Sequence, residues 1–458
     1  MADNKNTLCI SAFNSPQINF ARNEHRMCCR TKGIPITPEM LDTHGTKVFY
    51  QLDDLVKTKK DLLTGIRSPK CSYCWKVEDS GGVSPRSPYD QFVEFMAHTG
   101  WFGTKDYNII SDRLSNLSDD EANMLAKHLD FPHIIEIALT NTCDLKCVYC
   151  SSHFSTQWET EMIKYKEMRP RDITTPSPHL RDMFWKYFLE SGFKATKFIS
   201  FIGGEPLIIN EFYDDINLIL DKFSNYENQD ELQPVVIINV ITNLNSPPKY
   251  FKKLLDIIPV VLANKRLRLH IGISFESTGA KTEFIRSGTD WVRFSDNIHK
   301  LFGHVTLLPL DEKCRIELGI HATLNALSIS SLPEFSRFVV SLQADYGIHI
   351  HLYNNQVINP ARYNPAILTE DYAEYVDEAI NIISSNSTST PDMIDWIKWE
   401  SYCTFLQGIK NSILLPDKDQ DARKSFVKEI DKLCSRRNLD FHKTFPEMVD
   451  FYNMIKSS

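Results

Sequence analysis

The chain has 458 residues, 42% of them hydrophobic, and a formal net charge of −8. This length predicts two or three domains with sizeable cores, and the negative charge argues against a general attraction to nucleic acid or to anionic membranes. The sequence contains no recognisable secretory signal and no apolar run long enough to span a bilayer, so a cytoplasmic location is expected.

The eleven cysteines gather in clusters, which is typical of metal binding in a reducing compartment rather than of a disulfide framework. Near the N-terminus stand Cys9, Cys28, Cys29, Cys71 and Cys74, the last two in a C-x2-C pair that commonly clamps iron or zinc. We expect Cys9, Cys28, Cys71 and Cys74 to form one four-thiolate site, with Cys29 as the alternative to Cys28. A [4Fe–4S] cluster and a structural zinc ion both suit this donor set, and either would stabilise a lobe whose own core is small.

A second cluster has the spacing C-x3-C-x2-C and consists of Cys143, Cys147 and Cys150. It follows the apolar, strand-like run Ile134–Leu139, which places it at the C-terminal end of a strand, where barrel enzymes hold their catalytic groups. A [4Fe–4S] cluster usually takes four thiolates, so a loop with three would leave one iron open to an exogenous ligand. A zinc knuckle or a redox thiol cluster is the alternative, although zinc normally takes four protein ligands.

Beyond this loop, apolar strand-like runs alternate with helical stretches. Such alternation predicts parallel βαβ units and therefore an α/β fold. Strands are expected at 134–139, 198–202, 235–242, 267–275, 315–324 and 348–353. Helices are expected near 177–191, 208–224, 247–258, 290–302 and 331–344.

The second strand runs directly into Gly203, Gly204, Glu205 and Pro206. The glycines let the backbone approach a ligand closely, and the carboxylate of Glu205 is suited to accept hydrogen bonds from an ammonium group. On the fifth strand, His321, Thr323 and Asn325 stand at alternating positions, which predicts that they share one face.

The cysteine trio, followed by a strand that ends in Gly203-Gly204-Glu205-Pro206, resembles the signature of the radical S-adenosylmethionine (SAM) enzymes. The resemblance implies a partial (β/α)6 TIM-type barrel in which Cys143, Cys147 and Cys150 hold a [4Fe–4S] cluster and SAM chelates the fourth iron. It also implies that reductive cleavage of SAM yields a 5′-deoxyadenosyl radical.

The same resemblance assigns roles to neighbouring residues. Tyr149, just before the third cysteine, is expected near the adenine of SAM, while Gly203, Gly204 and Glu205 are expected to bind its methionine amino group. Thr242 and Asn243 begin the run Thr-Asn-Leu-Asn at the end of the third strand, which is similar to the family's T-N-G turn except that leucine replaces glycine.

At the end of the fourth strand, Ser274 and Glu276 match the family's pattern of serine, a hydrophobic residue and an acid. They are therefore expected to contact the carboxylate and ribose of SAM. Arg286 belongs to a segment similar to the family's R-x-G, and its guanidinium suits a planar carboxylate because it can bond both oxygens.

The N-terminal segment Cys71–Arg86 is similar to the SPASM/twitch module of radical SAM enzymes, which binds an auxiliary [4Fe–4S] cluster. Such modules usually follow the barrel, whereas these cysteines precede it. We therefore expect an auxiliary-cluster lobe over residues 1–130, the radical SAM barrel over 131–360 and a helical C-terminal extension over 361–458.

The activity that the resemblance implies is hydrogen abstraction from a substrate, most readily a peptide, assisted by the auxiliary cluster. The alternatives are dehydrogenation or epimerisation of a sugar or other small molecule, and a non-catalytic metal-stabilised binding or electron-transfer protein. The expected partners are that substrate and a one-electron reductant such as flavodoxin or ferredoxin, with no membrane and no nucleic acid. Cys403 or Cys434 could donate a hydrogen atom to a substrate radical, whereas Cys314 is expected to be a buried hydrophobe.

Overall fold

The computed structural model describes residues 7–79, 84, 86, 89–99, 101–128, 132–169, 177–190, 196–224, 235–386 and 399–457. Gly82 and Pro85, which belong to the SPASM/twitch-like segment, lie outside these residues. The chain divides into two compact units that interleave along the sequence. Unit 1 comprises Met1–Asn141, Arg169–Gly203 and Glu211–Ile238, and unit 2 comprises Thr142–Met168, Gly204–Asn210 and Asn239–Ser458.

Unit 1 contains a mixed sheet in which β1 (Gln17–Asn19) pairs antiparallel with β2 (Glu24–Arg26) and parallel with β4 (Ile134–Ala138). Strand β3 (Ile34–Pro35) pairs with β2, and β4 pairs in parallel with β5 (Phe198–Ile202). Its helices are α1 (Ser11–Asn14), α2 (Pro38–His44), α3 (Asp53–Leu63), α4 (Ser72–Asp79), α5 (Tyr89–Thr99), α6 (Tyr107–Ser115), α7 (Asp119–His128), α9 (Pro178–Glu190) and α10 (Asn210–Ser224).

An aromatic cluster stabilises the core of unit 1. Phe184 of α9 packs edge-on against Phe20 and Phe49, and Phe49 stacks on Tyr187 with ring centroids 5.4 Å apart. Aromatic pairs of this kind add stability beyond their buried area. The N-terminal residues thus share a hydrophobic core with α9, which lies far along the sequence.

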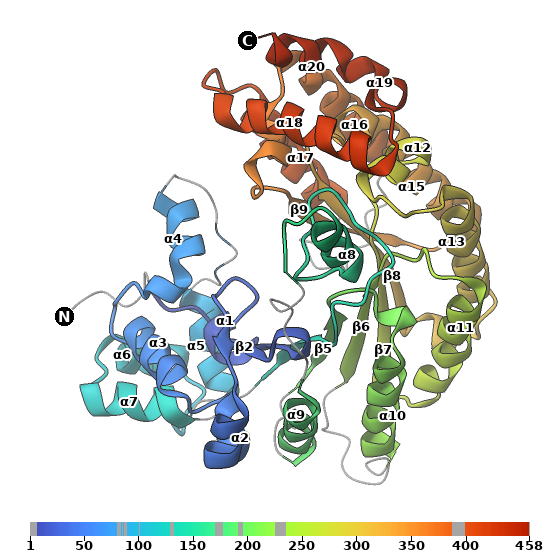
Figure 1. The fold of residues 1–458 in the computed structure, drawn as a ribbon. Coiled ribbons are helices and arrows are strands. Elements are labelled where there is room, and N and C mark those ends of the chain that lie inside the picture. The colour runs from blue at the N-terminus through green and yellow to red at the C-terminus, as the bar shows by residue number, and fades with distance from the viewer. Residues whose placement is uncertain are drawn as a thin grey trace. The chain divides into compact units, whose positions relative to one another are not determined.

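Unit 2 contains the parallel strands β7 (Leu267–Ile273), β8 (Ile316–Leu324) and β9 (Ile350–Gln356). Strand β6 (Val236–Thr242) begins in unit 1 and ends in unit 2. Figure 1 shows α11, α13 and α15 side by side along these strands. The helices of unit 2 are α8 (Thr156–Lys164), α11 (Pro248–Ala263), α12 (Gly279–Ile285), α13 (Trp291–Thr306), α14 (Leu310–Lys313), α15 (Leu332–Tyr346), α16 (Ala373–Ser385), α17 (Trp399–Ile413), α18 (Gln420–Arg437), α19 (Phe441–Thr444) and α20 (Val449–Lys456).

The two faces of β8 differ in polarity. Leu318 and Ile320 are fully buried, whereas Glu317, His321 and Thr323 on the opposite face keep partial exposure. Side chains alternate between faces along a strand, so one face forms the core and the other is polar. The polar face of β8 runs to the C-terminal end of the strand, where Thr323 lies.

The six predicted strands are all present, and the prediction of a mixed α/β fold with a largely parallel sheet is confirmed. Helix α11 extends beyond its predicted end at residue 258 and passes through Pro259, because Ile258, Val261 and Leu262 continue its buried face. Asn325, expected on the fifth strand, instead lies just beyond β8 and is fully buried in a turn. Among the described residues, no helix has the length and apolarity needed to cross a membrane.

Candidate functional site

The loop that holds Cys143, Cys147 and Cys150 lies wholly in unit 2, and all three thiols are at least half-buried. Burial, followed by the charge of Cys147, raises the pKa of Cys143, and burial raises the pKa of Cys147 to about 12 with a contribution from Cys150. The charges of successive thiols in the loop therefore act on one another's pKa. Cysteine thiolates are the usual protein ligands of iron–sulfur clusters, so the donor set suits such a cluster.

The backbone of this loop is hydrogen-bonded to the segment that contains Arg286. The N–H of Lys146 donates to the carbonyl of Ser287 at 2.9 Å, and that of Val148 donates to Ile285 at 2.8 Å. Gly288 has φ +107°, and a Cβ atom there would lie 2.9 Å from the carbonyl oxygen of Asp144. Glycine is therefore required at this position by both its backbone conformation and the proximity of the cysteine loop.

Helices α8 and α18 hold the same loop from another side. The indole N–H of Trp158 donates to the carbonyl of Cys147 at 2.9 Å, and Arg437 donates to the carbonyl of Lys146 at 2.9 Å. Arg437 also forms an ion pair with Glu161 at 3.0 Å, and its guanidinium lies over the Trp158 ring at 4.5 Å. The sequence analysis did not identify this clamp, since Arg437 is separated from the cysteines by most of the barrel sequence.

Glu205 follows two glycines in left-handed conformations, Gly203 at φ +80° and Gly204 at φ +56°. A Cβ on Gly203 would lie 2.9 Å from the Cβ of Ala138, so the turn requires glycine there. The carboxylate of Glu205 accepts hydrogen bonds from the N–H of Leu207 at 3.0 Å, the hydroxyl of Thr242 at 2.7 Å and the N–H of Asn243 at 2.6 Å. All three donors are neutral.

Burial, and after it the charge of Asp144, raises the pKa of Glu205 from 4.5 to about 7, although its hydrogen bonds lower it. No lysine, arginine or histidine in the described part of the chain pairs with this carboxylate, which is 1% exposed. A buried charge without a counter-charge is costly, so Glu205 favours either a proton or an exogenous cation.

The turn after β6 connects Glu205 to the cysteine loop. The side-chain amides of Asn243 and Asn245 donate to the two carboxylate oxygens of Asp144 at 2.8 and 3.1 Å. Leu244 between them has φ +51°, a left-handed conformation that favours glycine. The resembled family usually carries glycine at this position. Here the backbone is left-handed although the residue is leucine.

Tyr149, Glu276 and Arg286 form a second polar group beside the cysteines. Arg286 donates to one oxygen of Glu276 through Nε at 3.0 Å and through a terminal nitrogen at 2.8 Å, and the hydroxyl of Tyr149 donates to Glu276 at 3.1 Å. Burial alone would lower the pKa of Arg286, but Glu276, Tyr149 and Cys147 raise it, so the guanidinium stays charged. Arg286 and Glu276, which are both expected to contact SAM, are therefore paired with each other.

Ser274 is half-buried at the end of β7, and its N–H donates to the carbonyl of Thr242 at 2.8 Å. On the polar face below it, His321 stacks on Tyr353 with ring centroids 4.3 Å apart. Burial, followed by the charge of Arg286, lowers the pKa of His321 to about 4, so the ring is neutral near pH 7. The charge of Arg286 thus acts on the pKa of His321, which links this ring to the Tyr149–Glu276–Arg286 group.

In unit 1, the thiols of Cys9, Cys28, Cys71 and Cys74 lie near one another. Burial raises the pKa of Cys71 to about 12, and the charges of Cys28, Cys9 and Cys74 add to the effect. Cys29 instead has its pKa raised to about 12 by burial and then by the carboxylate of Glu136. Cys28 thus interacts electrostatically with Cys9, Cys71 and Cys74, whereas the exposed Cys29 interacts with Glu136 and Cys28; the choice of Cys28 over Cys29 as a ligand stays a prediction.

The residues that follow the C-x2-C pair also come together. The guanidinium of Arg86 donates to Glu78 at 2.8 Å, Ser84 donates to the same carboxylate at 2.6 Å, and Arg86 reaches the carbonyl of Leu8 at 3.0 Å. Arg86 also lies over the Trp75 ring at 4.5 Å. This network ties the segment after Cys74 to the segment before Cys9.

Within the described residues, no group of three or more His, Cys, Asp and Glu side chains has a geometry that could hold a metal ion. A four-iron cluster with its own sulfides holds its thiolates farther apart than a single ion does. Of the remaining cysteines, Cys314 is exposed at the end of α14 rather than buried at the start of a strand, because β8 begins two residues later. The thiol of Cys403 is hydrogen-bonded to Ser384 at 3.5 Å.

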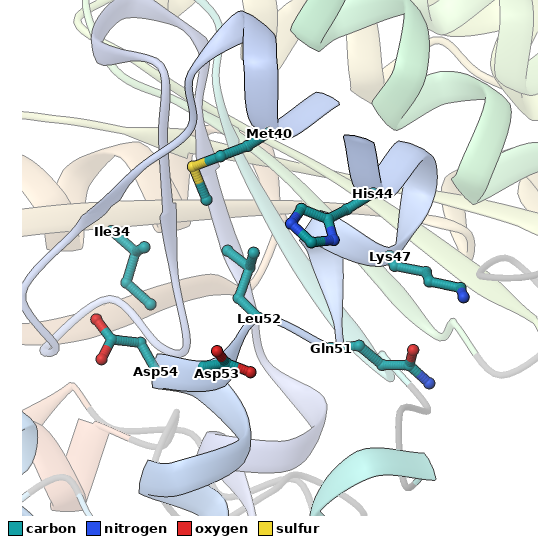
Figure 2. Close-up of a pocket in the computed structure, with 8 residues that line it drawn as sticks. All are labelled: Ile34, Met40, His44, Lys47, Gln51, Leu52, Asp53 and Asp54. Carbon is teal, nitrogen blue, oxygen red and sulfur yellow. The ribbon is translucent and has the colours of Figure 1, made fainter. Parts of the chain in front are cut away.

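A cavity of about 510 Å³ lies apart from these residues, within unit 1. Figure 2 shows Leu52 near the centre of the labelled residues, with Met40 above it, Asp53 below it, Asp54 at the lower left and Lys47 at the right. Apolar and oppositely charged side chains therefore share its wall. The remaining lining residues are Ile34, His44 and Gln51.

No protein-family model and no curated protein matches the chain. Among solved structures, it is similar to Streptococcus suis SuiB bound to S-adenosylmethionine, with a TM-score of 0.35 and 15% identity over 72% of this chain and 64% of that one. A second structure of SuiB gives a TM-score of 0.34 and 16% identity over 76% of this chain and again 64% of the other. TYW1 with a lysine-pyruvate adduct gives 0.29 and 15% identity over 56% of this chain and 74% of that one. The match covers less than two thirds of SuiB, and likeness at this level does not assign a function to the chain.

Proposed function

We propose that this chain is a radical SAM enzyme with an auxiliary [4Fe–4S] cluster and that its substrate is a peptide. The observation that supports it best is the buried carboxylate of Glu205, which has no cationic partner among the residues that the structure describes and is joined through Asn243 and Asp144 to the three-cysteine loop. SAM would supply both features that such a site needs, ligand atoms for an open iron and an amino group whose N–H could be donated to a buried carboxylate.

Cys143, Cys147 and Cys150 would hold the cluster, and Cys9, Cys28, Cys71 and Cys74 would hold the auxiliary one. When bound, cluster and SAM supply one-electron cleavage of the sulfonium and a carbon radical that abstracts hydrogen from the substrate. Such chemistry belongs to the cofactors, while the protein binds, orients and excludes water.

The described residues would divide that work between two carboxylates. Glu205, once ionised, would keep one lone pair to accept an N–H from the amino group of SAM, since Thr242 and Leu207 already bond one oxygen and Asn243 bonds the other. Glu276 is oriented by Arg286 and Tyr149, which leaves the phenol ring of Tyr149 to pack against a planar base. Because Arg286 is already paired with Glu276, we propose that it positions Glu276; its charge also lowers the pKa of Cys147 and Cys150, an effect that Glu276 partly opposes at Cys147.

The test is anaerobic reconstitution with iron and sulfide, followed by dithionite and SAM and quantification of 5′-deoxyadenosine by mass spectrometry. We expect product from the wild type and from Cys314→Ala, a matched control at an exposed thiol, and none from Cys143→Ala. Because turnover without substrate can be slow, the electron paramagnetic resonance spectrum of the reduced cluster is recorded with and without SAM. A loaded cluster that yields no product and whose spectrum SAM leaves unchanged would contradict the proposal.

The peptide substrate and the one-electron reductant are tested separately. A library of short peptides is added to the reconstituted enzyme, and the rate of 5′-deoxyadenosine formation is compared with that for sugars and other small molecules. Stimulation by peptides alone supports the peptide assignment, and stimulation by sugars alone replaces it. Replacement of dithionite by reduced flavodoxin or ferredoxin tests the reductant.

A further inference from the structure

A second cavity of unit 1, of about 550 Å³, has a strongly basic lining. Arg26, Arg30, Lys32 and Lys70 all contribute to it, and no acidic residue does. The whole chain has a net charge of −8, so this concentration of positive charge is local. The remaining lining residues are Cys29, Thr31, Pro69 and Ser72.

Neighbouring acids neutralise only part of this charge. Lys70 pairs with Asp54 at 2.9 Å, but Arg26 shares Glu24 with Arg22, which bonds the other oxygen of that carboxylate. The Nε–H of Arg26 is buried and has no hydrogen-bond partner in the described structure.

Arg30 and Lys32 are exposed, and among the described residues neither has an acidic partner within 4 Å. Arg30 lies against the ring of Tyr73 at 5.2 Å, which orients the guanidinium without cancelling its charge. Arg30 and Lys32 therefore bring two positive charges without a close ion-pair partner to the cavity, together with the partly neutralised Arg26; Arg30 also interacts at longer range with the buried carboxylate of Glu136.

The cavity also lies at the start of helix α4, whose first residue, Ser72, lines it. The first turn of this helix contains no acidic side chain, so the partial positive charge of its N–H groups is not offset there. The two lining segments, 26–32 and 69–72, contain Cys28 and Cys71. The basic cavity therefore lies beside the predicted auxiliary-cluster thiols.

We propose that this cavity binds a multiply charged anion, either a phosphate-bearing group or a polycarboxylate, beside Cys28 and Cys71. Guanidinium and ammonium groups recognise both classes through charge-assisted hydrogen bonds, and the volume is that of a small-molecule site. The inference does not depend on the proposed radical chemistry, since binding is measured without SAM or reductant.

The experiment is isothermal titration calorimetry of the whole chain in magnesium-free, low-salt buffer, with inorganic pyrophosphate in one series and citrate in the other. We expect saturable binding and an affinity reduced about tenfold or more in the double variant Arg30→Gln/Lys32→Gln, because two charge-assisted contacts are lost. The matched control is Lys57→Gln on α3, which removes one exposed charge from unit 1 outside the cavity. Charge-conserving Arg30→Lys/Lys32→Arg should keep most of the affinity.

Tighter binding of pyrophosphate would identify a phosphate-bearing ligand, and tighter binding of citrate a polycarboxylate. The single variants Arg30→Gln and Lys32→Gln, each expected to weaken binding several-fold, replace the double variant if its melting temperature falls. The proposal is overturned if neither anion saturates the wild type, if the double variant binds as the wild type does, or if Lys57→Gln loses as much affinity as the double variant.

Discussion

Glu205 is fully buried beside a second acid, Asp144, and receives only neutral hydrogen-bond donors. Its pKa rises from 4.5 to about 7, so the folded protein binds this proton more tightly than the unfolded chain does. The resulting stability is fully present below pH 4.5 and is lost as the pH rises through about 7. The ionised form is the one that an ammonium ligand would favour.

For Glu205→Gln we therefore expect a smaller fall in the free energy of unfolding between pH 5 and pH 8, by about 2–3 kcal/mol relative to wild type. Denaturant titrations at both pH values measure the difference, and the exposed Glu211→Gln is the control. SAM affinity should rise with pH through about 7 in the wild type and stay flat in the variant. Identical pH dependence in the two proteins would refute the assignment.

Leu244 is fully buried, which favours a large apolar side chain, but its φ of +51° favours glycine. We expect Leu244→Gly and Leu244→Ala both to be destabilised by lost burial, but the glycine variant to be more stable than the alanine variant by about 0.5–1 kcal/mol. At a buried position with an ordinary backbone conformation, the alanine variant would instead be the more stable of the two. Urea denaturation of the pair checks it, and an alanine variant at least as stable as the glycine variant would contradict the left-handed conformation.

At the scale of elements, α18 supports the cysteine loop through one side chain. Arg437 is 2% exposed and contacts Glu161, Trp158 and the carbonyl of Lys146, whereas Arg436 is more exposed and contacts Glu167 and Tyr165. The C-terminal helices thus position the loop, in addition to covering the sheet. Arg437 therefore acts on the cysteine loop through the carbonyl of Lys146, which belongs to the backbone that holds the thiols.

Arg437→Lys keeps the charge but loses the fork that bonds Glu161 and Lys146 together. We expect iron release to a chelator to become about tenfold faster or more, with a loss of about 2–4 kcal/mol in unfolding free energy. Arg436→Lys is the matched control and should change either quantity little. Equal effects of the two variants would mean that α18 contributes only general stability.

Much of this element-scale organisation could be predicted from sequence. The strand bounds followed from apolar runs, and the turn at Gly203 followed from its paired glycines. Strands β1, β2 and β3 were missed because two or three residues are too short to show alternation. Arg437 was missed because nothing in the sequence indicates which distant arginine reaches a given carbonyl.

On the scale of the whole molecule, the two predicted sets of cysteine ligands lie in different units: Cys9, Cys28, Cys71 and Cys74 in unit 1, and Cys143, Cys147 and Cys150 in unit 2. Each set would therefore bind its cluster with donors from one unit only. Metal content should then respond to the two sets independently, as interactions at separate sites usually add.

Cys71→Ala should lower the iron content from about eight to about four atoms per chain while the SAM-responsive resonance signal persists. Cys147→Ala should lower it equally and abolish that signal. Iron analysis and spectroscopy of both reconstituted variants, with Cys314→Ala alongside, measure this. Two zinc ions and no iron in the wild type would instead favour the metal-stabilised binding protein.

Arg437 stands 291 positions after Lys146, whose carbonyl it binds. Cys143, Cys147 and Cys150 are therefore synthesised long before the arginine that completes the support of their loop. A chain truncated before α18 would lack Arg437, so its cysteine loop would be without this support. If the loop holds the proposed cluster, its support is complete only once α18 has been made, and a chain that lacks α18 would leave Cys143, Cys147 and Cys150 more open to oxidation.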